Sequence, residues 1–245
     1  MASLSVLVFG ESKVGKSSLA VTAPGPRLLI DVEAASRFLP IRRTLWDPST
    51  PPPKPSDDWD TAVVQFRHWD DWPTIWRWLD SGKHPFTSII IDSVSEMQQR
   101  LIEKHAARGQ LSQQAWGTVL REMSGAMRDL RDLTEHPKRP VEAVVVTAMA
   151  KEVNGSLKPW VQGGFATILP YLMDVTGYLT ATDDGTRKLL TQRTEFIEAG
   201  NRAPAGTIPR VLTSPSISGM IDAIFPAPVN PAVAEVRAAA ASRDD

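Results

Sequence analysis

Residues 10–17 read Gly10-Glu11-Ser12-Lys13-Val14-Gly15-Lys16-Ser17, which is the pattern G-x-x-x-x-G-K-[ST]. The short apolar run Ser5–Phe9 comes directly before this stretch, and Ser17–Val21 after it has helical character. Strand, loop and helix in this order form the context in which the pattern binds phosphate. The stretch therefore predicts an α/β fold with a phosphate-binding loop after its first strand.

The residue types in this loop suit a nucleoside triphosphate. Gly10 and Gly15 allow the backbone to turn successive N–H groups toward phosphate oxygens. Lys16 is placed to neutralise the β- and γ-phosphates, and the Ser17 hydroxyl to bind Mg²⁺. We therefore predict ATP and Mg²⁺ as the cofactors. The residues predicted to contact the nucleotide are Gly10, Glu11, Ser12, Lys13, Val14, Gly15, Lys16, Ser17 and Ser18.

Acidic residues end two of the apolar runs that follow. Asp92 closes the run Ser88–Ile91, where a P-loop enzyme needs a carboxylate that holds Mg²⁺ through its water shell. Asp31 and Glu33 end the run after the loop helix, where a carboxylate can polarise the attacking water. The spacing alone also allows a solvated strand end there. We take Glu33 as the candidate general base and Lys16 as the catalytic cation.

Apolar runs and turn signals outline one domain over residues 1–225. Val175–Thr182 and Arg187–Thr194 flank the turn Asp183-Asp184-Gly185 and predict a hairpin. A helical stripe of apolar residues after residue 112 must lie on the sheet. The other expected strands are Arg27–Asp31, Ala62–Phe66, Ser88–Ile91 and Ala143–Thr147.

Two segments are predicted to lack regular structure. Asp47–Trp59 contains five prolines, which indicates a surface insertion within the domain. Residues 226–245 are rich in proline and alanine and are expected to be a disordered tail.

Tryptophans cluster around the proline-rich insertion. Packing of a satellite core is the favoured interpretation, and base stacking is the alternative. An amphipathic helix with Asp70 and Asp71 as caps is expected within this region. The cluster consists of Trp46, Trp59, Trp69, Trp72, Trp76 and Trp78.

Composition excludes several classes of protein. The formal net charge is −1, so nucleic-acid binding requires a local basic patch rather than a global field. The chain has no cysteine, no apolar run of membrane-spanning length and no histidine cluster at ligand spacing. We expect a cytoplasmic protein with no membrane association and no metal site made by protein ligands alone.

Five sequence blocks occur in the order typical of RecA-like ATPases, and the chain resembles that family over residues 3–210. It is most similar to the short phage AAA-type or RecA-like single-strand annealing recombination ATPases. This resemblance implies a RecA-like core with a mostly parallel twisted sheet, flanking helices and a C-terminal hairpin. The five blocks are GESKVGKS, LLIDVEA, IIIDSVSEM, AVVVTAMAKE and EAGNRAPAG.

The resemblance also implies roles and partners. Glu33 maps onto the residue that activates water, and Asp92 with Ser93 onto the strand-end pair. Single-stranded DNA, a homo-oligomeric ring or filament and a single-strand binding protein are the implied partners, in the cytoplasm of a bacterial host. Arg202 maps onto the basic residue that enters a neighbouring subunit's ATP site, with Arg210 as the substitute.

The segment Lys151–Gly164 occupies the position of the family's DNA-binding loop. It combines cations with a stacking ring, which suits single-stranded DNA, although a generic surface loop is the plainer interpretation. The residues predicted to contact DNA are Lys151, Lys158 and Trp160, with Arg108 extending the patch and Arg100 and Lys104 beside it.

Met149 departs from the family pattern, because its thioether cannot hydrogen-bond a γ-phosphate usefully. Thr147 could substitute for the usual polar sensor. The departure makes an ATP-dependent assembly, loader or adaptor module with weak hydrolysis a credible alternative. A GTPase is a weaker alternative, because the sequence lacks the Asp-x-x-Gly and Asn-Lys-x-Asp motifs.

Overall fold

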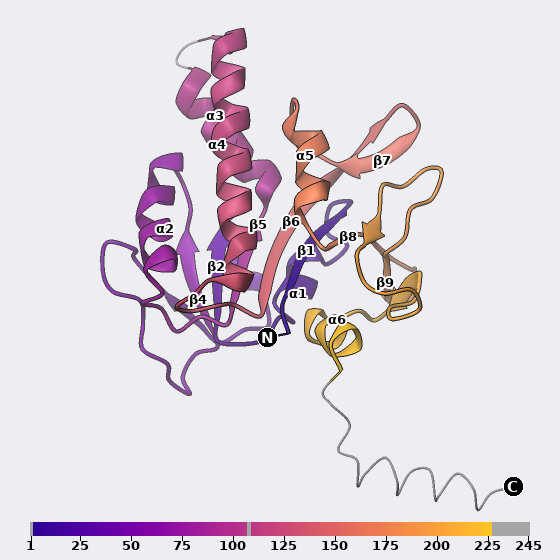
Figure 1. The fold of residues 1–245 in the computed structure, drawn as a ribbon, viewed down its shortest axis with the longest axis horizontal. Helices are drawn as coiled ribbons and strands as arrows, with labels where there is room; N and C mark the ends of the chain where they lie inside the picture. Colours follow the sequence, from indigo (N-terminus) through magenta and orange to yellow (C-terminus); the bar gives the residue numbers. More distant parts are fainter. Residues whose placement is uncertain (1, 107–108, 227–245) are drawn as a thin grey trace, which may run out of the picture.

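The computed structural model describes residues 2–106 and 109–226, and within them an eleven-stranded sheet forms the centre of the molecule (Figure 1). The strand order is β11-β9-β8-β1-β6-β5-β2-β4-β3, with β10 paired to β8 and β7 paired to β6. The strands are β1 Leu4–Gly10, β2 Arg27–Asp31, β3 Arg43–Leu45, β4 Thr61–Gln65, β5 Ser88–Asp92, β6 Ala143–Val153, β7 Ser156–Pro159, β8 Val175–Ala181, β9 Arg187–Leu190, β10 Gly200–Asn201 and β11 Val211–Thr213.

The centre of the sheet is parallel. From β3 to β8 every neighbouring pair in the strand order runs in the same direction, and only β7, β9, β10 and β11 pair antiparallel. The carboxyl ends of the parallel strands therefore meet at one edge, where ligands bind in open α/β sheets. The predicted α/β fold with a mostly parallel sheet flanked by helices is confirmed.

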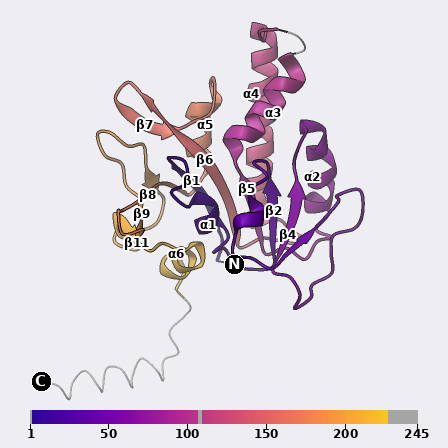
Figure 2. The same ribbon diagram turned by 180° about the vertical axis from the view of Figure 1, so that it is seen from behind.

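Helices cover both faces of the sheet (Figures 1 and 2). One core contains residues of α2, α3, α4 and α5, and a second core contains residues of α1 and α6. Leu7 and Phe9 of β1 belong to the first core, whereas Val6 and Val8 belong to the second. Because side chains alternate along a strand, β1 contributes to the core on both faces of the sheet. The helices are α1 Lys16–Ala20, α2 Trp72–Ser81, α3 Val94–Ala106, α4 Gln113–Asp132, α5 Phe165–Leu172 and α6 Ile217–Ile224, with 3-10 turns at Ser36–Phe38, Trp69–Asp71 and Leu133–Glu135.

The tryptophans pack as expected, but into the main core rather than a satellite. Trp46, Trp59, Trp69 and Trp72 are buried in the core of α2–α5, with Trp76 and Trp78 packed against it. Three of the indoles donate hydrogen bonds to carbonyls of the proline-rich insertion, namely Trp46 to Thr50, Trp59 to Lys54 and Trp78 to Pro48. The insertion contains no helix or strand between residues 47 and 59 and is held down by these bonds.

Asp71 holds the N-cap position of α2, as predicted, but its side chain does not bond the first turn of that helix. Its carboxylate accepts hydrogen bonds from the backbone N–H groups of Arg67 and His68, which precede it, at 3.1 Å each. It therefore stabilises the turn that leads into α2, where Asp71 itself already has helical backbone angles.

The segment expected as a loop at Lys151–Gly164 is partly a hairpin. Strand β6 continues beyond Thr147 to Val153 and pairs antiparallel with β7. The β6–β7 hairpin leaves the sheet at the same edge as the phosphate-binding loop, since Met149 pairs in register with Gly10. Figure 1 shows it projecting beside α5.

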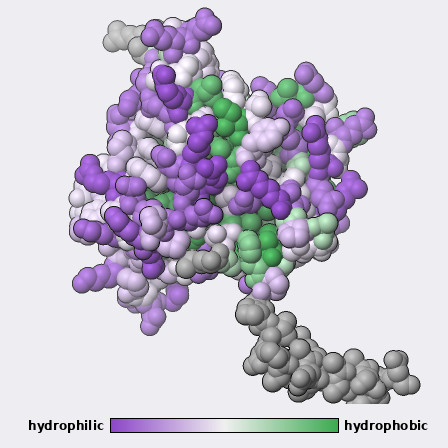
Figure 3. Space-filling model, in the orientation of Figure 1, coloured by the Kyte–Doolittle hydropathy of each residue, from purple (hydrophilic) through white to green (hydrophobic). Residues whose placement is uncertain are grey.

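The surface facing the viewer in Figure 3 is mostly hydrophilic, with apolar residues gathered at the seam between α4 and α5 and over α6. At the seam, Trp116, Leu120, Gly163 and Gly164 line a hollow of about 180 Å³. None of the described helices is long and apolar enough to cross a membrane. The tail predicted for residues 226–245 lies, apart from residue 226, outside the described residues.

Candidate nucleotide site

The loop between β1 and α1 uses its two glycines for different reasons. A Cβ atom on Gly10 would lie 2.5 Å from the carbonyl oxygen of Leu179 in β8, so this position needs the absence of a side chain. Gly15 has a φ of +96°, a conformation that strains other residues. The sequence predicts that both glycines allow the backbone turn of the loop. The structure shows this role for Gly15, whereas Gly10 allows β1 to pack closely against β8.

Lys16 begins α1, and its ammonium group lies back over the loop. The Nζ atom donates to the carbonyl oxygens of Gly10 at 3.1 Å and Glu11 at 2.6 Å. Desolvation lowers the pKa of Lys16, while the charges of Glu33 and Asp92 act in the opposite direction. The cation therefore lies near both the predicted general base Glu33 and the predicted metal ligand Asp92.

Asp92 is buried at the end of β5, directly beside the loop. The Thr147 hydroxyl donates a hydrogen bond to its carboxylate, and the Ser17 hydroxyl lies near enough to lower its pKa. Burial raises the pKa of Asp92, as do the nearby charges of Glu33 and Asp31, while the two hydroxyls lower it.

The donors at this point suit Mg²⁺. The described residues contain no cluster of three or more His, Cys, Asp or Glu side chains that could hold a metal ion. Mg²⁺ usually takes only one or two protein ligands and completes its shell with water and phosphate oxygens. One carboxylate and one hydroxyl, Asp92 and Ser17, fit that requirement.

Asp31 and Glu33, which the sequence could not separate, have different surroundings. The buried carboxylate of Asp31 accepts hydrogen bonds from the backbone N–H groups of Ala35 and Ser36 and from Gln65 Nε2, at 3.0–3.1 Å. Glu33 is exposed, and its Oε1 atom accepts one hydrogen bond from the hydroxyl of Ser93 at 2.5 Å. Asp31 is occupied in shaping the turn, whereas Glu33 has free oxygens that face the site.

Thr147 and the backbone of Met149 both contact groups of the protein near the site. The Thr147 hydroxyl is committed to Asp92 and lies 3.5 Å from the carbonyl oxygen of Ile91. Met149 contributes its backbone N–H, which donates to the Ser95 hydroxyl at 3.0 Å, and Ser95 donates in turn to the carbonyl oxygen of Trp160 at 2.6 Å. Ser95 thus connects the start of α3 to the β6–β7 hairpin.

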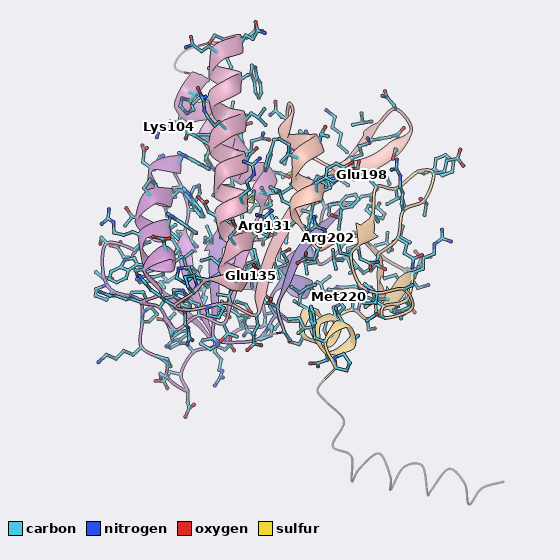
Figure 4. The ribbon with its side chains drawn as sticks, viewed as in Figure 1. Lys104, Arg131, Glu135, Glu198, Arg202 and Met220 are labelled. Atoms are coloured by element: carbon cyan, nitrogen blue, oxygen red, sulfur yellow. The ribbon has the colours of Figure 1, made fainter. Side chains whose placement is uncertain are left out.

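Arg202 lies at the opposite edge of the sheet from the loop. Its guanidinium bonds Asp174 Oδ1 at 3.2 Å and the carbonyl oxygen of Tyr171, and Asp174 in turn accepts hydrogen bonds from Ser5 near the start of β1. Figure 4 labels Arg202 near Arg131 and Glu135, and the three residues line one hollow of about 580 Å³.

Arg187 is a neighbour of the loop that the sequence analysis did not select. Its guanidinium lies against Gly15, so that a Cβ atom there would be 2.6 Å from Cζ and 2.9 Å from Nη2. Arg187 is therefore a second cation at the loop, beside the predicted Lys16. The one sequence signal for this placement is that Arg187 begins the second strand of the predicted hairpin.

The cations predicted to bind DNA are partly neutralised. Lys151 Nζ lies 5.7 Å from the ring centroid of Trp160, and this half-exposed pair remains available. Lys158 pairs with Glu198 at 3.4 Å, and Figure 4 labels Glu198 beside the hairpin. Arg100 pairs with two glutamates of its own helix and Lys104 with Asp70. Arg108 lies outside the described residues.

Comparison with known proteins agrees with this geometry. No curated protein matches the chain. A family model described as an AAA domain matches residues 2–203, which include the loop, both strand-end carboxylates and the hairpins. Because the match covers most of the chain, this protein belongs to the AAA domain family, whose members carry a nucleotide-binding P-loop domain.

Proposed function

We propose that this chain is a Mg²⁺-dependent ATPase that acts on single-stranded DNA as part of a homo-oligomer. The observation that carries the ATPase proposal is the convergence of Lys16, Ser17, Asp92 and Glu33 at one edge of the sheet. These side chains come from three neighbouring segments, yet the charges of Glu33 and Asp92 both act on Lys16. Structural needs alone give no reason to gather a lysine and two carboxylates there.

Each side chain has a distinct role in the proposed reaction. Lys16 and the loop N–H groups bind the phosphates, so Lys16 exchanges the carbonyl oxygens of Gly10 and Glu11 for phosphate oxygens. Ser17 and Asp92 would hold Mg²⁺, which would supply charge neutralisation for the phosphates. Glu33 orients a water molecule and accepts its proton, while Ser93 holds the carboxylate in place.

The β6–β7 hairpin supports the DNA part of the proposal. Lys151 over Trp160 offers a cation beside a stacking ring, which is the combination that single strands use. Trp160 is 42% exposed, so part of its side chain is accessible to a ligand. Ser95 joins the carbonyl of Trp160 to the start of α3, three residues after Asp92.

Replacing the lysine of the loop tests the nucleotide site. Lys16→Ala should abolish tight Mg-ATP binding with little loss of fold, because Lys16 is a half-buried point charge aimed at phosphate rather than a core residue. Isothermal titration measures the binding and circular dichroism the fold. The control is Lys54→Ala, which removes a lysine from the proline-rich insertion. Unchanged affinity in Lys16→Ala would refute the assignment.

The polynucleotide is tested by steady-state turnover with single-stranded DNA, duplex DNA and no DNA. We expect stimulation by single strands above the other two conditions. Weak turnover that no DNA changes would instead favour an assembly or loader module. A GTPase would show GTP displacing ATP from the site in a competition experiment.

A further inference from the structure

Arg187 places a second cation of the same chain at the phosphate-binding loop. The guanidinium covers the α-carbon of Gly15, as the distances of 2.6 Å and 2.9 Å from a Cβ atom at that position to Cζ and Nη2 show. Gly15 is the residue whose positive φ turns the loop toward Lys16. Arg187 therefore contacts the phosphate-binding loop directly, at Gly15.

The direction of Arg187 follows from strand alternation. Leu189, two residues further along β9, is buried in the core beside α1 and α6. Residues two apart in a strand share a face, so Arg187 points to the α1 side of the sheet. Lys188 points to the opposite side, as does Leu190, which packs against the core of α2–α5.

Pairing across the sheet holds this placement firmly. Arg187 pairs with Ala181 across the hairpin, and β8 pairs directly with β1, where Leu179 is in register with Gly10. The turn between the two strands is fixed by the Asp184 carboxylate, which accepts hydrogen bonds from the Thr182 hydroxyl and the Thr186 N–H. Arg187 is thus preorganised on β9, the partner of the strand that pairs with β1.

The guanidinium of Arg187 has no ion-pair partner within the part of the chain that the structure describes. Among the described residues, no carboxylate lies within 4.0 Å of its guanidinium, whereas Arg27, Arg100, Arg131 and Arg202 each have an acidic partner. Arg187 lies against Gly15, directly before the cation Lys16 in the chain. Two cations beside a loop of inward N–H groups suit an anion with several negative oxygens.

We propose that Arg187 binds, in cis, the phosphates that ATP and ADP share. This inference rests on the proposed nucleotide function and adds a residue to it. Loop N–H groups of this kind cradle the α- and β-phosphates, while the lysine extends toward the γ-phosphate. Because Arg187 lies against Gly15, it addresses the α- and β-phosphates. It is therefore a binding residue and differs in role from a residue that stabilises the transferring γ-phosphoryl group.

The test is the dissociation constant of Mg-ATP and of Mg-ADP, measured by isothermal titration for the wild type, Arg187→Ala, Arg187→Lys and Lys188→Ala. Arg187→Ala should weaken both nucleotides by roughly ten- to a hundredfold, the range for a hydrogen bond between charged groups. Arg187→Lys should recover part of the loss, because it keeps the charge but not the planar fork. Lys188→Ala, a loss of charge one residue away on the opposite face, should change affinity less than about twofold.

Three results would overturn the inference: unchanged affinity in Arg187→Ala, weakening of ATP alone, or an equal loss in Lys188→Ala. Thermal unfolding without nucleotide verifies that each variant folds, and Arg187→Gln replaces the alanine variant if that one does not. Loss of binding in Lys16→Ala but not in Arg187→Ala would refute the inference alone. Failure of the wild type to bind either nucleotide would refute both the inference and the proposed function.

Discussion

At the scale of single residues, neighbouring carboxylates differ in how many hydrogen bonds they already accept from the protein. Asp31 and Asp92 are in register across β2 and β5, and both are buried. Asp31 accepts three hydrogen bonds from protein donors, whereas Asp92 accepts one from the hydroxyl of Thr147 and lies beside the loop. Glu33, two residues after Asp31, is exposed and bound only by Ser93 among the described residues. Glu33 is therefore the acid of this pair with carboxylate oxygens left to bind a water molecule.

Glu33→Gln separates binding from hydrolysis. The amide keeps the shape of the side chain but cannot accept a proton, so Mg-ATP affinity should persist while turnover falls at least about a hundredfold. Single-turnover kinetics with titrated affinities measure both quantities. Asp31→Asn is the comparison, and it should lower stability because an amide nitrogen faces N–H donors. If Glu33→Gln hydrolyses ATP at the wild-type rate, the base is another group.

His84 gives the fold a dependence on pH. Burial lowers its pKa to about 4, as do the charges of Arg139 and His136, and neither ring nitrogen has a hydrogen-bond partner among the described residues. Since the folded pKa lies below the unfolded value of 6.5, the unfolded state binds more protons between these values. Stability is therefore complete above pH 6.5 and falls as pH drops toward 4, by at most about 3 kcal/mol.

His84→Phe should remove this part of the pH dependence, because Phe keeps an aromatic ring against Phe86 and does not titrate. Urea unfolding at pH 7 and pH 4.5 measures the free energy of unfolding of both proteins. The difference between wild type and variant cancels the other titrating groups. Equal losses in the two proteins would show that His84 does not carry the effect.

At the scale of elements, β6 belongs to two structures. Its first half lies in the parallel sheet between β1 and β5, and its second half forms the hairpin with β7. Ser95 of α3 bonds the backbone of Met149 where these halves meet and the carbonyl of Trp160 where the hairpin returns. Ser95 therefore links the start of α3 to both ends of the hairpin.

Ser95→Ala should uncouple the hairpin from the site. Basal ATP turnover should stay near the wild-type rate, while stimulation by single-stranded DNA should fall several-fold, because the hydroxyl bridge is lost. The measurement is turnover against DNA concentration. Ser124→Ala is the matched control, since the buried Ser124 hydroxyl has no hydrogen-bond partner among the described residues. Full stimulation in Ser95→Ala would mean that coupling follows another path.

At the scale of the whole molecule, the sheet separates Arg202 from the ATP site of its own chain. Arg202 is tied to Asp174, which bonds Ser5, whereas the loop starts at Gly10. Five residues of strand span about 17 Å, which is longer than an arginine side chain. In this arrangement Arg202 does not reach the phosphate-binding loop of its own chain. Its ion pair with Asp174 is exposed, and such pairs contribute about 0–1 kcal/mol, so it does not prevent release.

We therefore predict that Arg202 completes the ATP site of a neighbour. Arg202→Ala should bind ATP almost normally but hydrolyse it poorly, and activity of the wild type should rise faster than linearly with protein concentration until oligomers dominate. Mixing Arg202→Ala with Lys16→Ala should recover turnover at interfaces that pair an intact Lys16 with an intact Arg202. No recovery in mixtures that co-assemble would count against the role, and a fully active monomer would exclude it.

The sequence by itself determined the elements whose signals are local. Strand β2 begins and ends at the predicted Arg27 and Asp31, because a continuous apolar run buried on both faces has few alternative structures. The loop from Gly10 to Ser17 was identifiable because its glycines, lysine and hydroxyl are adjacent in the chain. Short elements with weak patterns escaped prediction, among them β3, β10, β11, α5 and α6.

Only the tertiary structure decided which side chains share the site and which are occupied elsewhere. It separated Asp31 from Glu33 through hydrogen bonds to Ala35, Ser36 and Gln65, and it placed Arg187 against Gly15. Contacts of this kind depend on strand order and register, which join residues far apart in the chain. The periodicity of the sequence indicates which side chains share a face of a strand. Which residues contact that face depends on the order and register of all the strands.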